Sequence, residues 1–286
     1  MLAVGTQRAA KLNWLQHHLP EGLLVDAAWL EEQGFSTALR SKYLRHGWLE
    51  QLARAVYRRP PAWLGEPDEE KRLLWQSVVI SLQMLLGRPV AVGGRSALEQ
   101  QGFAHYLTPS GPRELHLYGD AALPGWAPKL KLDVRLVFHN SKRLFKEGMA
   151  CGSLPAAADR DLAQSGFIRQ PWGQQEWPLV MSAPERAILE LLDELPRRET
   201  FHQADMLVEG LRNLRPRRLQ KLLADCRSIK VKRLFLWFAE RHGHAWLKKL
   251  DRNAINLGRG KRMLVRDGKL DTKYGITVPG DLDART

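Results

Sequence analysis

STALRSKYLRHG, residues 36–47, is the stretch that sets the expected fold at the N-terminal end of this chain. It predicts a short helix, because Ser36 can cap the free backbone N–H groups of the first turn and Gly47 can end the last turn. Leu39 and Tyr43 are four residues apart, so they share a face that can turn inward. The rest of the helix is basic, which makes it a candidate to contact a negatively charged partner.

The neighbouring segments extend this helix into a larger pattern. A second short helix is expected at about residues 25–32, and Gly34 ends it before the basic helix begins. Residues 48–52 and 55–58 have the composition of two short strands. Two helices joined by a glycine-containing turn form a helix-turn-helix, and the two strands would add a β-ribbon. This order predicts a winged helix-turn-helix DNA-binding domain over residues 1–62.

Positive charge gathers in two parts of the chain. Residues 36–59 hold six Lys or Arg and one Glu, a balance typical of segments that contact phosphate. The whole chain has 286 residues and a net charge of +13. Residues 212–269 hold 18 Lys or Arg and 4 Asp or Glu, so this region alone carries 18 − 4 = +14. This concentration of charge predicts a surface that binds DNA, RNA or an acidic protein. The alternative is that the charge serves only solubility.

The pattern yields two sets of candidate binding residues. Residues of the basic helix would face the major groove or its phosphates, and those of the wing would lie beside the minor groove or the backbone. The DNA-binding candidates are Ser36, Thr37, Arg40, Ser41, Lys42, Arg45, His46, Arg54, Arg58 and Arg59. A second basic surface is expected from Arg215, Arg217, Arg218, Lys221, Lys230, Lys232 and Arg233. A solvated basic face, or a winged helix that binds only protein, remains an open alternative.

Residues 63–286 predict a larger domain of mixed type. Alternation of apolar and polar residues at 114–118 and 131–138 predicts strands, which residues 167–168 and 177–180 can extend into a sheet. Most of the chain after residue 182 is expected to be helical. The expected fold class is therefore α+β: a winged helix-turn-helix domain followed by a larger mixed α/β domain with a basic helical C-terminal part.

Several other classes of protein are not expected. Cys151 and Cys226 form no disulfide or metal-binding pattern, so neither a metal nor another cofactor is expected. Neither a secretory signal nor a long apolar run is visible, so we expect a cytoplasmic protein without membrane contact. Gly93-Gly94 lacks the spacing of a phosphate-binding loop, and the plainer interpretation is a tight turn into a helix.

The alternative function is a nuclease, or another nucleic-acid-modifying enzyme, guided by the winged helix. Asp133 falls in an expected strand, but the sequence after it lacks the Glu-x-Lys that would complete a nuclease metal site. His242 and His244 are close in sequence, yet no third metal ligand accompanies them. We therefore expect no catalytic residue and no enzymatic activity.

Four ordered stretches resemble the AbiEi family of antitoxins from bacterial type IV toxin–antitoxin systems, which provide phage defence by abortive infection. The stretches are residues 41–49 with 55–57, 93–107, 183–190 and 268–279. The resemblance implies a winged helix that binds operator repeats upstream of its own operon and represses it. It also implies a C-terminal domain that counters a nucleotidyltransferase-like toxin without a stable complex. Relatives often carry Gly at the wing turn, where this chain has Ala53 and Ala55.

Overall fold

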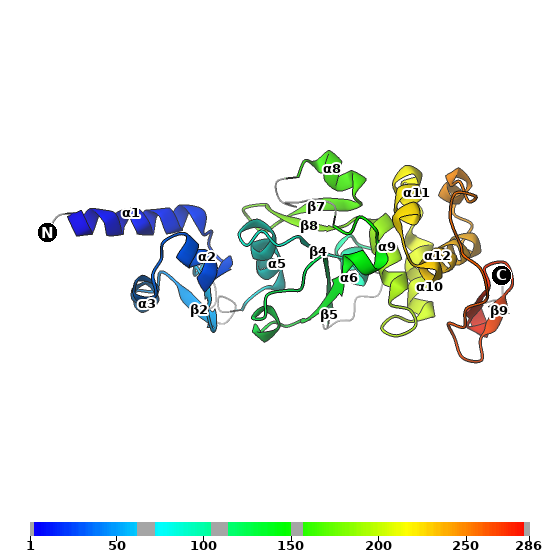
Figure 1. Ribbon diagram of the computed structural model, residues 1–286, viewed down its shortest axis with the longest axis horizontal. Helices are drawn as coiled ribbons and strands as arrows, with labels where there is room; N and C mark the ends of the chain where they lie inside the picture. The colour runs from blue at the N-terminus through cyan, green and yellow to red at the C-terminus, as the bar shows by residue number, and fades with distance from the viewer. Residues whose placement is uncertain (1–2, 62–71, 104–113, 150–156, 283–286) are drawn as a thin grey trace. The chain divides into compact units, whose positions relative to one another are not determined.

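The computed structural model describes four stretches of the chain (Figure 1): residues 3–61, 72–103, 114–149 and 157–282. The chain divides into two compact units, and neither is a single continuous stretch. The first unit comprises Met1–Arg88, Leu123–Arg135 and Pro171–Leu179, and the second comprises Pro89–Ala122, Leu136–Gln170 and Val180–Thr286. The first unit thus extends beyond residue 62, the domain boundary expected from the sequence.

The first unit begins with three helices and a small antiparallel sheet. The elements are α1 (Ala3–His18), β1 (Leu24–Asp26), α2 (Ala27–Glu32), α3 (Thr37–Arg45), β2 (Glu50–Ala53) and β3 (Val56–Arg58). The sheet order is β1-β3-β2. Strand β1 was not expected, because residues 25 and 26 were assigned to the helix that follows. The order of helix, strand, two helices and hairpin is the one expected of a winged helix-turn-helix.

Local signals in the sequence set the ends of α2 and α3. The Asp26 carboxylate accepts from the backbone N–H of Trp29 at 3.0 Å, which caps α2. The Ser36 hydroxyl accepts from the N–H of Leu39 at 3.3 Å, which caps α3 as expected. Gly34 lies between the helices with a φ of +77°, a conformation that glycine adopts at low cost.

The core beneath these helices is aromatic and aliphatic. Leu15, Leu30, Phe35 and Tyr43 are fully or almost fully buried, and the rings of Phe35 and Tyr43 meet edge to face at 5.9 Å. Leu39 remains partly exposed, so Tyr43 provides most of the inward face of α3. This packing fixes which side of α3 faces solvent.

Later segments of the chain, among them α5 (Trp75–Met84) and η1 (Ala127–Lys129), add to the first unit. Helix α5 contributes the Ser81 hydroxyl, which accepts from the backbone N–H of Leu24 in β1 at 2.9 Å. A short 3-10 helix, η1, follows Trp126, whose indole N–H donates to Asp26 at 3.3 Å. Helix α5 begins at Trp75, and residues 62–71 lie outside the described part of the chain.

A five-stranded sheet is the centre of the second unit, although residues 135, 171–172 and 177–179 of its strands belong to the first unit. Its strands are β4 (Val90–Val92), β5 (Glu114–Gly119), β6 (Arg135–Asn140), β7 (Phe167–Trp172) and β8 (Trp177–Ser182), in the order β6-β5-β4-β8-β7. The central strand β4 is buried, antiparallel to β5 and parallel to β8. Strand β6 begins at Arg135, four residues later than expected.

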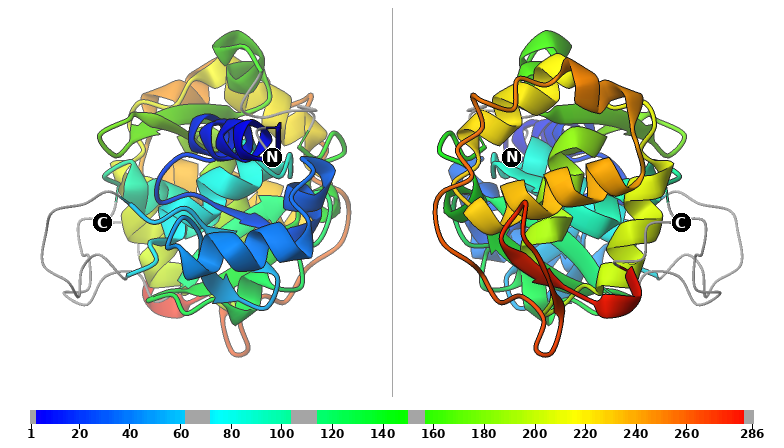
Figure 2. Two further views of the ribbon diagram at one scale, coloured as in Figure 1. Left: turned by 90° about the vertical axis from the view of Figure 1, so that its left-hand side faces the viewer. Right: turned by 90° about the vertical axis from the view of Figure 1, so that its right-hand side faces the viewer.

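Helices form the rest of the second unit, and the C-terminal hairpin faces the viewer in red in the right-hand view of Figure 2. The elements are α6 (Gly94–Gln100), α7 (Ser141–Leu144), α8 (Asp159–Gln164), α9 (Pro184–Asp193), α10 (Phe201–Gly210), α11 (Pro216–Asp225), α12 (Ile229–Arg241), η2 (Ala245–Lys249), β9 (Lys269–Asp271), β10 (Ile276–Val278) and η3 (Gly280–Leu282). The mixture of helices and strands confirms the α+β class. None of the described helices is long and apolar enough to cross a bilayer.

A buried ion pair joins the elements around the sheet. The Arg186 guanidinium on α9 donates to Glu190 at 2.9 Å and lies over the rings of Phe145 and Phe167 at 4.1 and 4.4 Å. The Glu190 carboxylate also accepts from the backbone N–H of Gly94 at 2.9 Å, at the start of α6. These contacts satisfy two charges that would be costly to bury alone.

Candidate nucleic-acid interface

One face of α3 is polar and open to solvent. Thr37, Ser41 and Arg45 are exposed and follow one another at intervals of four residues, so they lie along a single side of the helix. Ser36 and His46, at the two ends of the helix, are also exposed, and Lys42 is half-buried. The exposed face therefore offers hydroxyl, imidazole and cationic groups, which are the types that contact phosphates and base edges.

Arg40 is not part of this face, contrary to the position expected from the sequence. Its side chain is buried, with 5% exposed, and its guanidinium donates to the carbonyl of Phe35 at 2.9 Å and to the Thr37 hydroxyl at 3.0 Å. It also forms an ion pair with Glu31 of α2 at 2.8 Å. Arg40 thus holds α2 and α3 together. The spacing contained this information, since Arg40 is three residues before the buried Tyr43.

The three arginines expected on the wing also differ in exposure in the β2–β3 hairpin. Arg54 is exposed at the hairpin turn. Arg58 is buried, with 4% exposed, and its Nε donates to the Glu50 carboxylate of the neighbouring strand at 3.0 Å. Arg59 donates to the carbonyl of Gln16 at 2.7 Å and to Glu21 at 2.6 Å. Only Arg54 of the three projects freely from the wing.

The turn between β2 and β3 places a residue other than glycine in a left-handed backbone conformation. Ala55 has a φ of +63°, in the left-handed region that favours glycine. Its carbonyl accepts from the backbone N–H of Ala27, the first residue of α2, at 2.9 Å. This bond ties the turn to α2 and helps to hold Ala55 in its unusual conformation.

Trp48, which was expected to begin a strand, is a surface residue. Its indole is 37% exposed and stacks on the ring of His46, with the centroids 5.1 Å apart. It also meets the ring of the buried Tyr43 edge to face, with the centroids 5.0 Å apart. The stacked pair extends the exposed face of α3 beyond the end of the helix. An aromatic residue directly after a helix-ending glycine was the available signal.

The second expected basic surface divides between the two helices that carry it. Arg215, Arg217 and Lys221 are exposed on α11. Lys232 and Arg233 of α12 are buried, because α12 packs on nearly every side. These two residues therefore do not form a basic surface.

The cations of α12 bind the protein's own backbone. Arg233 donates to the carbonyls of Leu257 and Gly260, each at 2.7 Å. Lys230 donates to the carbonyl of Leu195 at 2.9 Å. Burial lowers the pKa of Lys232. Positive charge on α12 thus fixes the C-terminal segment and is largely withheld from solvent.

Glu185 orders the start of α11. Glu185 lies in the first turn of α9, whose capping residue Ala183 makes no side-chain bond. The buried Glu185 carboxylate accepts from the backbone N–H of Arg215 at 2.7 Å and from Arg218 at 3.0 Å. Arg218 is therefore neutralised, while the side chain of Arg215 is left exposed.

Family models match nearly the whole chain. Residues 8–109 match the N-terminal domain of the AbiEi antitoxin transcriptional regulators, and residues 113–279 match the AbiEi antitoxin transcriptional regulators of type IV toxin–antitoxin systems. The chain belongs to the AbiEi antitoxin family. This confirms the resemblance seen in the sequence. No curated protein is significantly similar to this AbiEi sequence.

A solved structure shares the fold of this AbiEi protein. It is described as the crystal structure of RV2827C protein from Mycobacterium tuberculosis. The TM-score is 0.54 at 16% sequence identity, and the match covers 95% of this chain and 90% of that chain. At this identity the likeness concerns the fold alone.

The acids and histidines of this AbiEi protein do not assemble a metal site within the described residues. Asp133, the acid considered for a nuclease, forms an exposed ion pair with Arg72 at 2.7 Å. His116 Nδ1 lies 3.0 Å from His139 Nε2, and His139 Nδ1 lies 3.2 Å from Glu194. Burial, followed by the charge of His139, lowers the pKa of His116 to about 4.

Proposed function

We propose that this AbiEi protein represses its own operon by binding operator DNA through α3 and the β2–β3 hairpin. The observation that carries the proposal is the exposed face of Thr37, Ser41 and Arg45, which the buried Arg40 and Tyr43 orient toward solvent. Arg54 lies at the turn of the hairpin, in the position from which a wing contacts the backbone or minor groove. Net positive charge in this segment favours the approach to DNA.

The structure refines the set of residues assigned to DNA contact. We assign contact to Ser36, Thr37, Ser41, Lys42, Arg45, His46, Trp48 and Arg54. Arg40, Arg58 and Arg59 hold the module together through ion pairs with Glu31, Glu50 and Glu21. Their removal would weaken DNA binding through loss of structure, so they are unsuitable for a test of direct contact.

The test is fluorescence anisotropy with DNA from upstream of the gene, alongside a scrambled duplex, over a series of salt concentrations. Arg45→Ala is expected to lower the affinity for upstream DNA by about 1–3 kcal/mol if Arg45 reads a base. If Arg45 contacts only phosphate, the slope of the logarithm of the binding constant against the logarithm of the salt concentration should become less steep by about 0.9 on both duplexes. Arg88→Ala removes an exposed arginine outside the module and is the matched control. Equal affinities for the Arg45 and Arg88 variants would exclude α3 as the reading helix.

We also propose that the second unit counters a nucleotidyltransferase-like toxin encoded with it, without a stable complex. Its support is membership of the antitoxin family, since the family model covers residues 113–279. Deleting residues 1–62 is a poor test, because it removes β1, whose backbone bonds to Ser81. The triple variant Lys42→Ala, Arg45→Ala and Arg54→Ala is expected to keep the fold, because none of the three side chains is buried. Co-expression with the toxin should show full protection together with loss of repression, and loss of both would contradict the separation of roles.

The alternative of a winged-helix-guided nuclease has less support. Asp133 is paired with an exposed arginine, and no described group of acids or histidines is arranged to hold a metal ion. Family membership as a transcriptional regulator also favours a protein without catalysis. Cleavage of plasmid DNA by the purified protein, lost in Asp133→Asn, would support the nuclease instead.

A further inference from the structure

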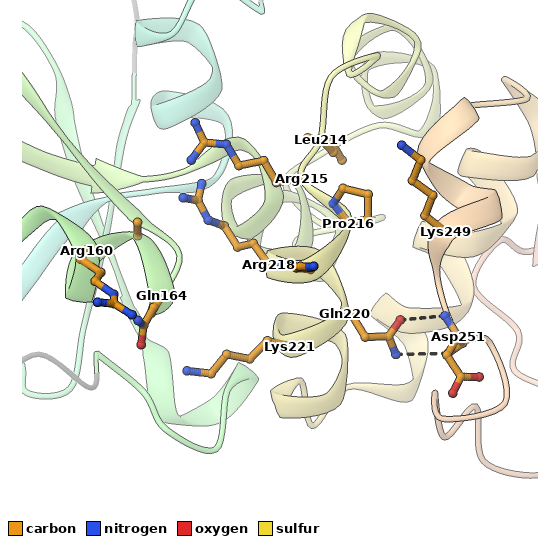
Figure 3. A pocket seen from close by; sticks show the side chains of 12 residues that line it. Arg160, Gln164, Leu214, Arg215, Pro216, Arg218, Gln220, Lys221, Lys249 and Asp251 are labelled. Atoms are coloured by element: carbon orange, nitrogen blue, oxygen red, sulfur yellow. Dashed lines mark hydrogen bonds between the residues drawn. The ribbon is translucent and has the colours of Figure 1, made fainter.

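A hollow of about 1030 Å³ lies in the second unit between α8 and α11, with η2 at its rim (Figure 3). Its volume is at the upper end of the range of small-molecule sites, about 300–1,000 Å³. The described lining residues are Arg160, Ala163, Gln164, Leu214, Arg215, Pro216, Arg217, Arg218, Gln220, Lys221, Lys249 and Asp251. Six of these twelve carry positive charge and one carries negative charge, so the hollow attracts anions.

The cations differ in how available they are. Arg218 is held by the buried Glu185 at 3.0 Å. Lys221 lies 3.6 Å from Glu147, and both side chains are about half exposed, so this pair is weak. Four further cations are exposed and form no ion pair with any residue in the described part of the chain: Arg160, Arg215, Arg217 and Lys249.

The single acid of the hollow contributes little repulsion. The Asp251 carboxylate accepts from the backbone N–H groups of Asn253 and Ala254, at 3.0 and 3.3 Å. Its backbone is bonded in both directions to the Gln220 amide, at 3.0 and 3.1 Å, as Figure 3 shows. Asp251 is therefore committed to its own turn, and Gln220 fixes that turn against α11.

The shape of the hollow distinguishes among anionic ligands. None of its described lining residues is aromatic, so it lacks the stacking platforms on which single-stranded nucleic acids depend. It is concave, whereas the backbone of a duplex is convex and follows an extended surface. Four free cations around a concave space suit a compact ligand with three or four negative charges. Guanidinium groups bind phosphate oxygens with two parallel hydrogen bonds.

We propose that this hollow is a binding site for an oligophosphate, either the di- or triphosphate group of a nucleotide or an inorganic oligophosphate. Arg215 and Arg217 would hold the phosphates from α11, Arg160 from α8 and Lys249 from η2. The backbone N–H of Arg215 is already taken by Glu185, so side chains and not the helix end bind the ligand. The site is separate from α3 and goes beyond the proposed function, since it does not depend on operator binding.

The test is isothermal titration calorimetry of the full chain with sodium tripolyphosphate and with ATP. The hollow variant is Arg215→Gln with Lys249→Gln, which removes two of the cations that line the hollow. The matched control is Arg212→Gln with Lys248→Gln, which removes the same charge from exposed residues that do not line the hollow. The hollow variant is expected to bind both compounds at least about tenfold more weakly than the wild type and the control variant do.

The relative affinities identify the source of the phosphates. ATP that binds more tightly than tripolyphosphate would indicate a nucleotide, and equal or weaker binding of ATP would indicate an inorganic oligophosphate. The proposal is overturned if neither compound binds at millimolar concentration, or if the hollow variant and the control variant lose affinity equally. It is also overturned if a scrambled duplex binds through Arg215 and Lys249 while tripolyphosphate does not bind, because the hollow would then be a nucleic-acid site.

Discussion

Replacing Ala55 with glycine should stabilise the protein. Ala55 has a φ of +63°, and a side chain in the left-handed region costs roughly 1–2 kcal/mol relative to glycine. Glycine loses more conformational freedom on folding, which offsets about 0.5–1 kcal/mol of that gain. The net expectation is a gain of up to about 1.5 kcal/mol in the free energy of unfolding, with a central value of about 0.75 kcal/mol.

Ala53→Gly is the matched control for this prediction. Ala53 lies in β2, paired with Val56, and is not among the residues with positive φ. Glycine there brings only the entropic cost, so the control should lose about 0.5–1 kcal/mol. Each variant removes one methyl group, and the two positions are only two residues apart. Ala55→Gly should nevertheless raise the free energy of unfolding, whereas Ala53→Gly should lower it.

Urea unfolding of the full chain, followed by circular dichroism, measures both variants. Hydrogen exchange of the peptide covering residues 50–58 adds a local measurement, because exchange reports the opening of individual segments. Ala55→Gly should slow exchange in this peptide and Ala53→Gly should accelerate it. A loss of stability in Ala55→Gly as large as that in Ala53→Gly would refute the left-handed conformation of the turn.

Two further predictions concern buried groups. Arg40→Met is expected to lower the free energy of unfolding by about 1–3 kcal/mol, because the carbonyl of Phe35 loses its donor. Thermal unfolding measures this loss, with the exposed-site variant Arg45→Ala as the control. Equal losses of stability in the two variants would argue against the burial of Arg40. His116 has its pKa lowered from 6.5 to about 4, so between these values the unfolded chain binds a proton that the folded chain does not, and stability is lost as pH falls through this window. The loss amounts to about 3 kcal/mol. His116→Asn should flatten the stability profile between pH 6.5 and 4, whereas the exposed His17→Asn should leave it as in the wild type.

Local signals predicted the first unit best. Ser36, Gly34 and Gly47 act over a few residues, so the start of α3 and the C-terminal ends of α2 and α3 can be read directly from the sequence. Strand β1 was missed for a different reason. Three residues are too few to show a period, and Val25 becomes a strand only because β3 lies alongside it, at a sequence distance of about thirty residues.

The count of charged residues could not identify which basic side chains face solvent and can bind a partner. The basic residues of α12 and those of α11 look equivalent in a count of charge, but Arg233 binds backbone carbonyls in the C-terminal segment. Whether a cation faces solvent depends on packing from elements distant in the chain. The same limit applied to Arg40 and Arg58, whose acidic partners were visible in the sequence while their pairing was not.

The hollow on α11 was beyond what the sequence could show. Arg160 is more than fifty residues away from Arg215, and no motif connects them. Only the fold brings α8, α11 and η2 together around one space. The run of basic residues at 215–221 was the available signal, and it pointed to a surface without revealing its concave shape.

The discontinuous first unit has a consequence for synthesis on the ribosome. The indole N–H of Trp126 donates to Asp26, and residues 171–179 also belong to this unit. The helix-turn-helix therefore emerges long before the segments that complete its unit, and β4 and β5 of the second unit emerge in between. Domains usually fold in order from the N-terminus as they are translated. Here the first unit must wait for part of the second, so the nascent chain cannot complete the first unit before much of the second unit exists.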